Sequence, residues 1–136
     1  MSCGLGLGDF IAISKLAITV YTAYKDAPKD YQNIAEEVKS LQIMINKAAQ
    51  HTKSTALSHN DLQEGQEVLR GCQSVLEDLN SLIEKWNSLS SATTSQVFKR
   101  VKLGTEDITT LRARLISNTG LLSSFIRRFE VSTMIQ

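Results

Sequence analysis

Residues 62–86 read LQEGQEVLRGCQSVLEDLNSLIEKW, and apolar or small side chains recur along them at alternating steps of three and four. This spacing is that of one face of an α-helix. The seam consists of Leu62, Gly65, Leu69, Cys72, Leu76, Leu79, Ile83 and Trp86. A second row beside it, Val68, Val75, Leu82 and Leu89, widens the apolar stripe. A stripe this wide predicts a helix that packs against two neighbours rather than a two-stranded coiled coil.

Three further segments repeat this spacing on either side of residues 62–86. Their seams are Phe10, Ile13, Ala17, Val20 and Tyr24; then Tyr31, Ile34, Val38, Leu41, Ile45 and Ala48; and finally Ile108, Leu111, Leu115, Asn118, Leu122, Phe125 and Phe129. Polar stretches at 50–58 and 88–95 are short enough to favour antiparallel neighbours. The sequence therefore predicts an all-α protein, an up-and-down four-helix bundle with one short extra helix, at 96–103, before the last long helix.

Local signals set the expected boundaries. Asp9 can cap the first helix, and the run Ser58-His59-Asn60-Asp61 offers caps for the third. We expect a flexible leader at 1–8, a single helical bundle at 9–132 and a tail at 133–136.

Two features depart from a simple amphipathic pattern. The first helix carries Ile11, Leu16 and Ile18 beside its seam, so it is apolar around most of its girth. Such a helix is either central in its bundle or has a second apolar destination. Asn118 is the one polar residue on the last seam, which predicts either a buried amide that fixes the register or a partly exposed position.

The composition limits the class of protein. The chain has 136 residues, is 42% apolar and 21% charged, and carries a net charge of +1, which excludes a disordered tail and a polybasic nucleic-acid arm. Its two cysteines, Cys3 and Cys72, are too few for a disulfide scaffold and suit a reducing compartment. Residues 1–9 lack the basic start of a signal peptide, and the apolar stretch of 10–24 is too short to span a bilayer. We expect a cytoplasmic protein.

No motif for catalysis or cofactor binding is found. His51 and His59 stand apart from other metal-ligating residues, and the glycines of residues 4–8 lack the strand and the Lys-Ser/Thr tail of a phosphate loop. No aromatic platform accompanies the bases, so nucleic acid is not an expected partner. The sequence predicts a non-enzymatic protein without cofactor or metal.

The net charge hides an uneven distribution. Residues 1–68 sum to −2 and residues 69–136 to +3, and every arginine lies in the second half. Residues 97–128 contain seven basic and two acidic residues, which gives this stretch a net charge of +5. This stretch is either an ordinary solvated face or a contact for anionic lipid headgroups or an acidic partner. The candidates for that contact are Lys99, Arg100, Lys102, Arg127 and Arg128.

Four blocks carry a family resemblance. They are SCGLGLGDFIAIS at 2–14, EEVKSLQIMI at 36–45, GCQSVLEDL at 71–79 and FKRVKLGTEDITTLRARLISNTGLLSSF at 98–125. On these the chain resembles the fungal N-terminal domain of STAND (NLR-like) proteins, in the HeLo-like group of helical domains. The resemblance implies a bundle placed ahead of a nucleotide-binding oligomerisation domain. It also implies a role in programmed cell death or heterokaryon incompatibility, in which oligomerisation frees the apolar first helix to act on a membrane.

Two hypotheses of function follow. In the first, the domain signals by homo-oligomerisation and associates with an anionic membrane, being recruited from the cytoplasm to the plasma membrane. The residues expected to insert are Phe10, Ile11, Ile13, Leu16, Ile18 and Val20. In the second, the bundle is a protein-interaction adaptor that never touches lipid, and the extra apolar residues of the first helix pack on a partner or a second copy.

Overall fold

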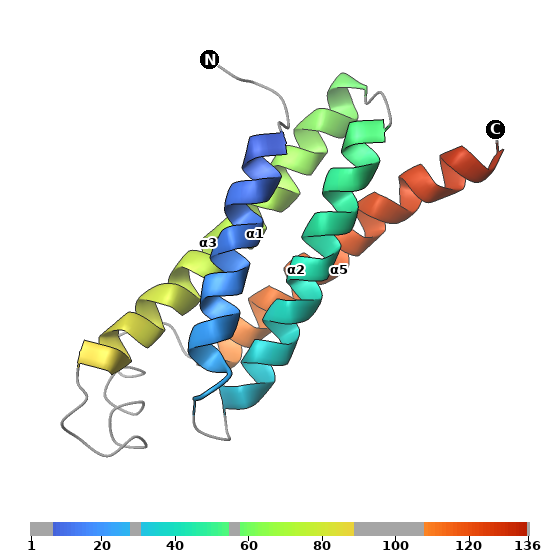
Figure 1. The fold of residues 1–136 in the computed structure, drawn as a ribbon. Coiled ribbons are helices and arrows are strands. Elements are labelled where there is room, and N and C mark those ends of the chain that lie inside the picture. Colours follow the sequence, from blue (N-terminus) through green and yellow to red (C-terminus); the bar gives the residue numbers. More distant parts are fainter. Residues whose placement is uncertain (1–6, 28–30, 55–57, 89–107, 136) are drawn as a thin grey trace.

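The computed structural model describes residues 7–27, 31–54, 58–88 and 108–135. Within these ranges the chain forms four α-helices and no strand: α1 (Leu7–Tyr24), α2 (Gln32–Ser54), α3 (His59–Ser88) and α5 (Ile108–Ile135) (Figure 1). The prediction of an all-α chain with four long helices is confirmed. The short helix predicted at 96–103 lies outside the described residues.

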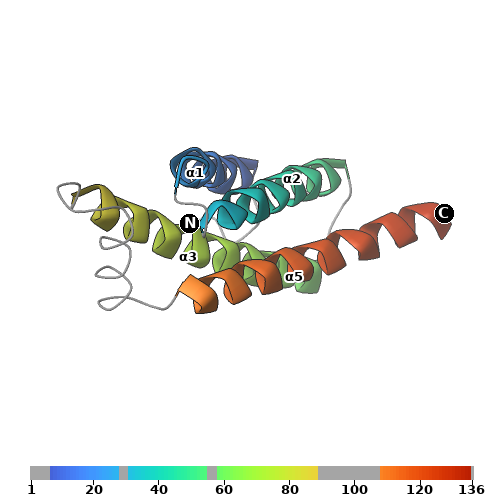
Figure 2. The same cartoon turned by 90° about the horizontal axis from the view of Figure 1, so that it is seen from below.

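The helices pack in two layers. Figure 2 shows α1 and α2 on one side of the molecule and α3 and α5 on the other. Besides these two pairings, α1 packs on α3 and α2 packs on α5. Each helix therefore has two principal neighbours, as the wide apolar stripe of residues 62–89 predicts for α3.

Side-chain contacts establish that both layers are antiparallel pairs. In one layer Ser14 bonds to Asn46 and Lys39 lies over the ring of Tyr21, so α1 and α2 run in opposite directions. In the other layer Arg128 meets Glu64 and Arg114 meets Asp78, which sets α3 and α5 antiparallel as well.

The core is built mainly from the predicted seams. Four seam residues are only half-buried, namely Tyr31, Leu62, Ile108 and Asn118, and the side chains of Trp86, Leu89 and Phe129 lie outside the described part of the chain. The large side chains of the core that are almost completely buried include Tyr24, Ile34, Leu41, Ile45, Leu76, Leu79, Ile83, Leu111, Leu115 and Leu122. The second row of α3 is buried too, because Val68, Val75 and Leu82 face the neighbouring helices. Burial of an aliphatic side chain of this size contributes about 1.5–3 kcal/mol, so these seams supply most of the energy that holds the helices together.

The helix boundaries differ from the expected ones in small ways. Helix α1 begins at Leu7, so Asp9 lies in its first turn, where the helix dipole favours an acid, and is not the cap. Helix α2 continues through the polar stretch as far as Ser54, because polar residues on a solvated face do not end a helix. Helix α5 runs on to Ile135, past the boundary expected at residue 132. Ser58 caps α3 as predicted, its Oγ accepting a hydrogen bond from the Asp61 N–H at 3.1 Å.

Candidate functional site

Helix α1 divides the six predicted insertion residues into two groups. Phe10, Ile13 and Val20 belong to the core, and Leu16 is half-buried against it. Ile11 and Ile18, by contrast, are 46% and 49% exposed. They stand seven residues apart and therefore share one face of the helix. Helix α1 is thus not enclosed on all sides, and it presents two large apolar side chains to solvent.

Helix α2 continues this exposed surface. Ile43 is 47% exposed, and it lies four residues from both Lys39 and Lys47, so the three share one face of α2. On α1, Lys15 stands between Ile11 and Ile18 on the same outer side. We call this surface the α1–α2 face; its residues are Ile11, Lys15, Ile18, Lys39, Ile43 and Lys47. It combines isolated isoleucines with exposed lysines.

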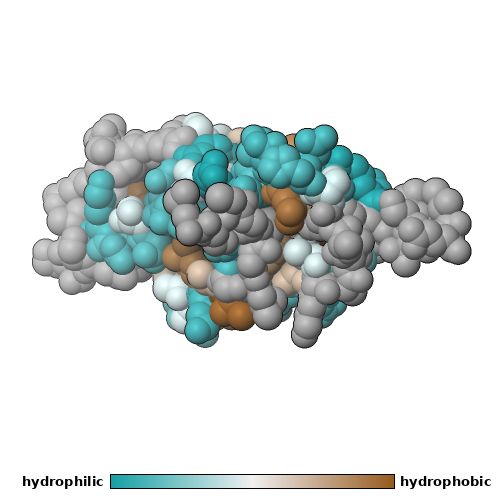
Figure 3. Space-filling model, turned by 90° about the horizontal axis from the view of Figure 1, so that it is seen from above, coloured by the Kyte–Doolittle hydropathy of each residue, from teal (hydrophilic) through white to brown (hydrophobic). Residues whose placement is uncertain are grey.

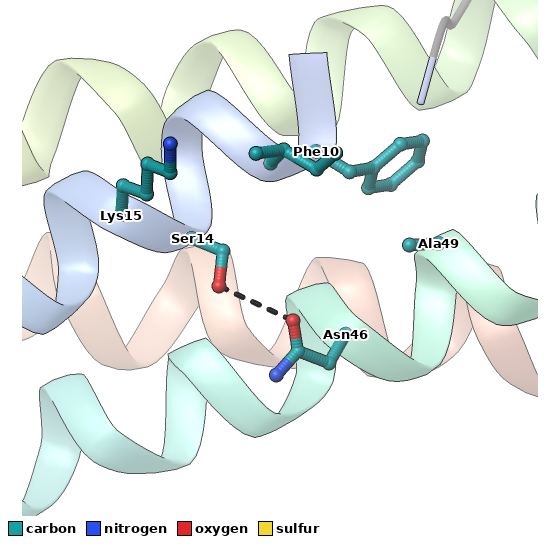
Figure 4. Close-up of a pocket in the computed structure, with 6 residues that line it drawn as sticks. Phe10, Ser14, Lys15, Asn46 and Ala49 are labelled. Carbon is teal, nitrogen blue, oxygen red and sulfur yellow. Dashed lines mark hydrogen bonds between the residues drawn. The ribbon is translucent and has the colours of Figure 1, made fainter. Parts of the chain in front are cut away.

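A small groove lies where the two helices of this face meet. Its volume is about 140 Å³, and it is lined by Phe10, Ile11, Ser14, Lys15, Asn46 and Ala49. Figure 4 shows Ser14 and Asn46 pointing toward one another across it, and the Ser14 hydroxyl donates to Asn46 Oδ1 at 3.2 Å. Ligand pockets for small molecules measure about 300–1,000 Å³. The groove is therefore too small for such a ligand, and the Ser14–Asn46 hydrogen bond across it joins α1 to α2.

The lysines of the α1–α2 face were not singled out by the sequence pattern. Lys15, Lys39 and Lys47 are exposed, and the Lys39 amine lies 5.9 Å from the centroid of the Tyr21 ring. In the sequence, the one pattern that could have identified them is that each lysine stands three or four residues from an isoleucine outside the apolar seam. That signal is weak, because lysine at such positions is common on any solvated helix face.

The arginines of residues 97–128 do not form the open basic patch that their sequence suggests, because several of them pair with acids of the same chain. Lys99, Arg100 and Lys102 lie outside the described residues. Arg127 is exposed, whereas Arg128 forms an ion pair with Glu64 and lies 3.9 Å from Asp61. The guanidinium of Arg128 also stacks 5.6 Å from the Phe125 ring centroid. Of the two predicted contact residues in α5, Arg128 is paired with acids of α3 and Arg127 is not.

Two further arginines of the same stretch tie α5 to its neighbours. Arg112 Nε donates to both carboxylate oxygens of Glu37 on α2, at 3.1 and 3.2 Å, and Nη2 donates to Oε1 as well. This bonding raises the pKa of Arg112. Arg114 donates to Asp78 Oδ2 at 2.8 Å and to Ser74 Oγ at 3.2 Å, both on α3. The local charge of +5 is therefore partly offset by acids that lie far away in sequence.

The remaining polar and reactive groups belong to the core. Tyr24 donates its hydroxyl proton to the Leu79 carbonyl at 2.8 Å, and burial raises its pKa. Burial also raises the pKa of the Cys72 thiol to about 12, so that it stays protonated and unreactive at neutral pH. Asn118 is half-buried, its Nδ2 donating to the Arg114 carbonyl at 2.8 Å. Its side chain packs against Gly71. Of the two alternatives predicted for Asn118, a buried amide and a partly exposed one, the structure shows the partly exposed one.

The described residues form neither a membrane-spanning helix nor a cluster of metal ligands. None of their helices is both long enough and apolar enough to cross a bilayer. No cluster of histidine, cysteine or acidic side chains in the described ranges could hold a metal ion. Figure 3, which views the molecule from above, shows hydrophobic residues exposed at separate places among hydrophilic ones. The α1–α2 face is accordingly the strongest candidate for a functional surface.

Comparison with known proteins adds no relative. The chain matches no family model, and no curated protein and no solved structure shows significant similarity to it.

Proposed function

We propose that this chain is a non-enzymatic signalling domain that acts by homo-oligomerisation and membrane association through its first helix. The proposal includes an up-and-down course of the bundle, the resemblance to the fungal N-terminal domain of STAND proteins, and recruitment from the cytoplasm to the plasma membrane. One observation carries it: Ile11 and Ile18 remain about half exposed, whereas the other large apolar side chains between Phe10 and Tyr24 are buried or half-buried.

Energetics indicate how α1 would first meet a membrane. Its side chains in the core include Phe10, Ile13, Val20 and Tyr24. At about 1.5–3 kcal/mol each, their burial amounts to about 6–12 kcal/mol, which is similar to the stability of a whole domain. Spontaneous release of α1 from a single resting copy is therefore rare. First contact uses the exposed α1–α2 face, and release of α1 needs energy from clustering or lipid binding.

The charges of this face suit an anionic surface. Lys15, Lys39 and Lys47 are exposed beside Ile11, Ile18 and Ile43. Each lysine near an anionic membrane contributes about 1 kcal/mol, and the half-exposed isoleucines add a similar amount each. A single copy would therefore bind weakly. Several copies held together bind far more tightly, because each further contact becomes intramolecular. Membrane association and oligomerisation thus support each other.

Binding to vesicles tests the proposal. We expect Ile11→Glu and Ile18→Glu to abolish binding to anionic vesicles while the fold persists, since both side chains are exposed. Gln63→Glu adds the same charge to an exposed position of α3 and should bind as the wild type does. Dye release from anionic vesicles is then measured with the domain forcibly clustered by a fused oligomer. Wild-type binding by both isoleucine variants, or no leakage on clustering, would contradict the proposal.

The second candidate is an adaptor that binds another protein and no lipid. One observation favours it: Arg128, expected to meet headgroups, is held by Glu64 of the same chain. In that case Ile11→Glu and Ile18→Glu would break assembly and leave membrane affinity unchanged. In either case a nucleotide-binding domain is the expected neighbour in a longer chain, and the gene sequence beyond the codon for Gln136 tests this.

A further inference from the structure

Helix α5 carries a second exposed face, on the opposite layer of the bundle from the α1–α2 face (Figure 2). Six exposed residues form it, and we call it the α5 outer face: Ala113, Ile116, Ser117, Gly120, Leu121 and Ser124. Their spacing of three, four, seven, eight and eleven residues is that of one continuous helical face. Ile116 and Leu121 are 56% and 53% exposed, the largest exposures among the large apolar side chains of the described residues.

Gly120, in the middle of this face, is not required by close packing against the described residues of its own chain. A Cβ built on it would meet nothing within 4 Å, and its backbone is ordinary helix. Glycine inside a helix is nevertheless unfavourable, because it loses more conformational freedom on folding than any other residue. Gly71 is different, because a Cβ there would run into Asn118 of the same chain. The small size of Gly120 is thus available for the approach of another backbone.

The α5 outer face itself carries no charge, and the exposed Arg127 stands on the same side of the helix, three residues beyond Ser124. Between residues 113 and 124 the one charged residue is Arg114, and Asp78 holds it against α3. Arg112, just before the face, is held by Glu37 against α2. Two copies of this face could therefore meet antiparallel without repulsion between like charges, because the two Arg127 side chains would then lie at opposite ends of the contact.

We propose that the α5 outer face pairs with the same face of a second copy, with the two α5 helices antiparallel about a two-fold axis between residues 118 and 119. In this register Ser117 lies level with Gly120 of the partner copy, Ile116 with Leu121, and Ala113 with Ser124. Small residues therefore meet small ones at the centre, where the backbones approach most closely. The large side chains close the two sides of the contact. Such a self-matching pattern is what an isologous interface requires.

The size of the face sets the strength of pairing. A single helix face of this length buries well under the about 1,200 Å² that marks the lower end of stable interfaces. The dimer is therefore weak and depends on concentration. This inference rests on the clustering step of the proposed function and names the surface that performs it. Because the α1–α2 face is on the other layer, a paired molecule keeps that face free.

Cysteine cross-linking tests the register. In a Cys3→Ser background, Ala113→Cys and Ser124→Cys proteins are mixed and oxidised. The antiparallel pair predicts a disulfide-linked heterodimer in the mixture and little cross-linking of either protein alone, because like positions lie far apart. Cys72 is buried and does not interfere. Equal cross-linking in all three samples, or none in the mixture, overturns the proposal.

Sedimentation of the uncross-linked protein tests the surface itself. At concentrations up to about 1 mM, the wild type should show a monomer–dimer equilibrium, and Gly120→Leu should shift it at least tenfold toward monomer. Gly120→Leu has open space in its own chain, so its melting temperature should not fall. Ile11→Glu should dimerise as the wild type does. Undiminished dimerisation of Gly120→Leu overturns this inference, whereas a wild type that dimerises but does not bind anionic vesicles overturns the proposed function alone.

Discussion

The contact between Gly71 and Asn118 yields the sharpest prediction about stability. In Gly71→Ala the new Cβ would lie 2.4 Å from Asn118 Oδ1 and 3.3 Å from Asn118 Cγ. Both distances are shorter than ordinary contact. The amide is not free to turn away, because its Nδ2 donates to the Arg114 carbonyl at 2.8 Å. The substitution must therefore either shift α3 relative to α5 or break this hydrogen bond.

Two opposing effects determine how much Gly71→Ala changes the free energy of unfolding. Overpacking of a well-packed contact costs about 1–3 kcal/mol, and a lost hydrogen bond about 1 kcal/mol. Replacing a helical glycine by alanine stabilises the helix by about 1 kcal/mol. The clash is the larger effect, so we expect Gly71→Ala to lower the free energy of unfolding by about 1–2 kcal/mol.

Gly120→Ala is the matched control, because it is the same substitution in a helix with open space at the Cβ. It should raise the free energy of unfolding by up to about 1 kcal/mol. In an Asn118→Ala background the obstacle is gone, so Gly71→Ala should become stabilising by a similar amount. The double-mutant cycle should therefore give a coupling of about 2 kcal/mol between the two positions.

Urea unfolding followed by far-ultraviolet circular dichroism measures these differences, at concentrations low enough to keep the chain monomeric. The predicted sign is opposite for Gly71→Ala and Gly120→Ala. If both substitutions move the unfolding midpoint in the same direction by the same amount, or if the coupling is below about 0.5 kcal/mol, the packing of α3 on α5 through Asn118 is refuted.

Two further predictions concern the ion pair of α2 with α5 and the buried thiol. Glu37→Gln should lower the free energy of unfolding by about 0.5–1 kcal/mol at low salt, because Arg112 loses its charged partner while still reaching water. The difference from wild type should shrink at about 1 M salt, and a salt-independent loss would contradict it. The pKa of Cys72 is raised from 9.0 to about 12, so the thiol ionises first in the unfolded chain and stability falls as the pH rises from 9 toward 12. Between about pH 8 and about pH 10 the wild type should lose about 1 kcal/mol more than Cys72→Ala does, and equal losses in urea unfolding would contradict this.

The sequence alone determined the helices and their buried faces. Helical periodicity is a local property, and it identifies the apolar side of a segment whatever later covers that side. Accordingly the seams around Leu76, Ile45 and Leu115 are the core. The cap at Ser58 was predictable for the same reason, because capping depends on neighbours within one turn.

The tertiary structure decided which helix covers each face and which charges meet. The basic stretch of residues 97–128 suggested a free cationic surface, yet Arg112, Arg114 and Arg128 bind Glu37, Asp78 and Glu64. These partners are 75, 36 and 64 residues away, and no local spacing relates them. Likewise, the apolar girth of the first helix left open whether it is central in the bundle. Ile11 and Ile18 are exposed because α1 has principal neighbours, α2 and α3, on only part of its circumference. Periodicity identifies an apolar face, but only the packing of distant segments determines whether that face is covered.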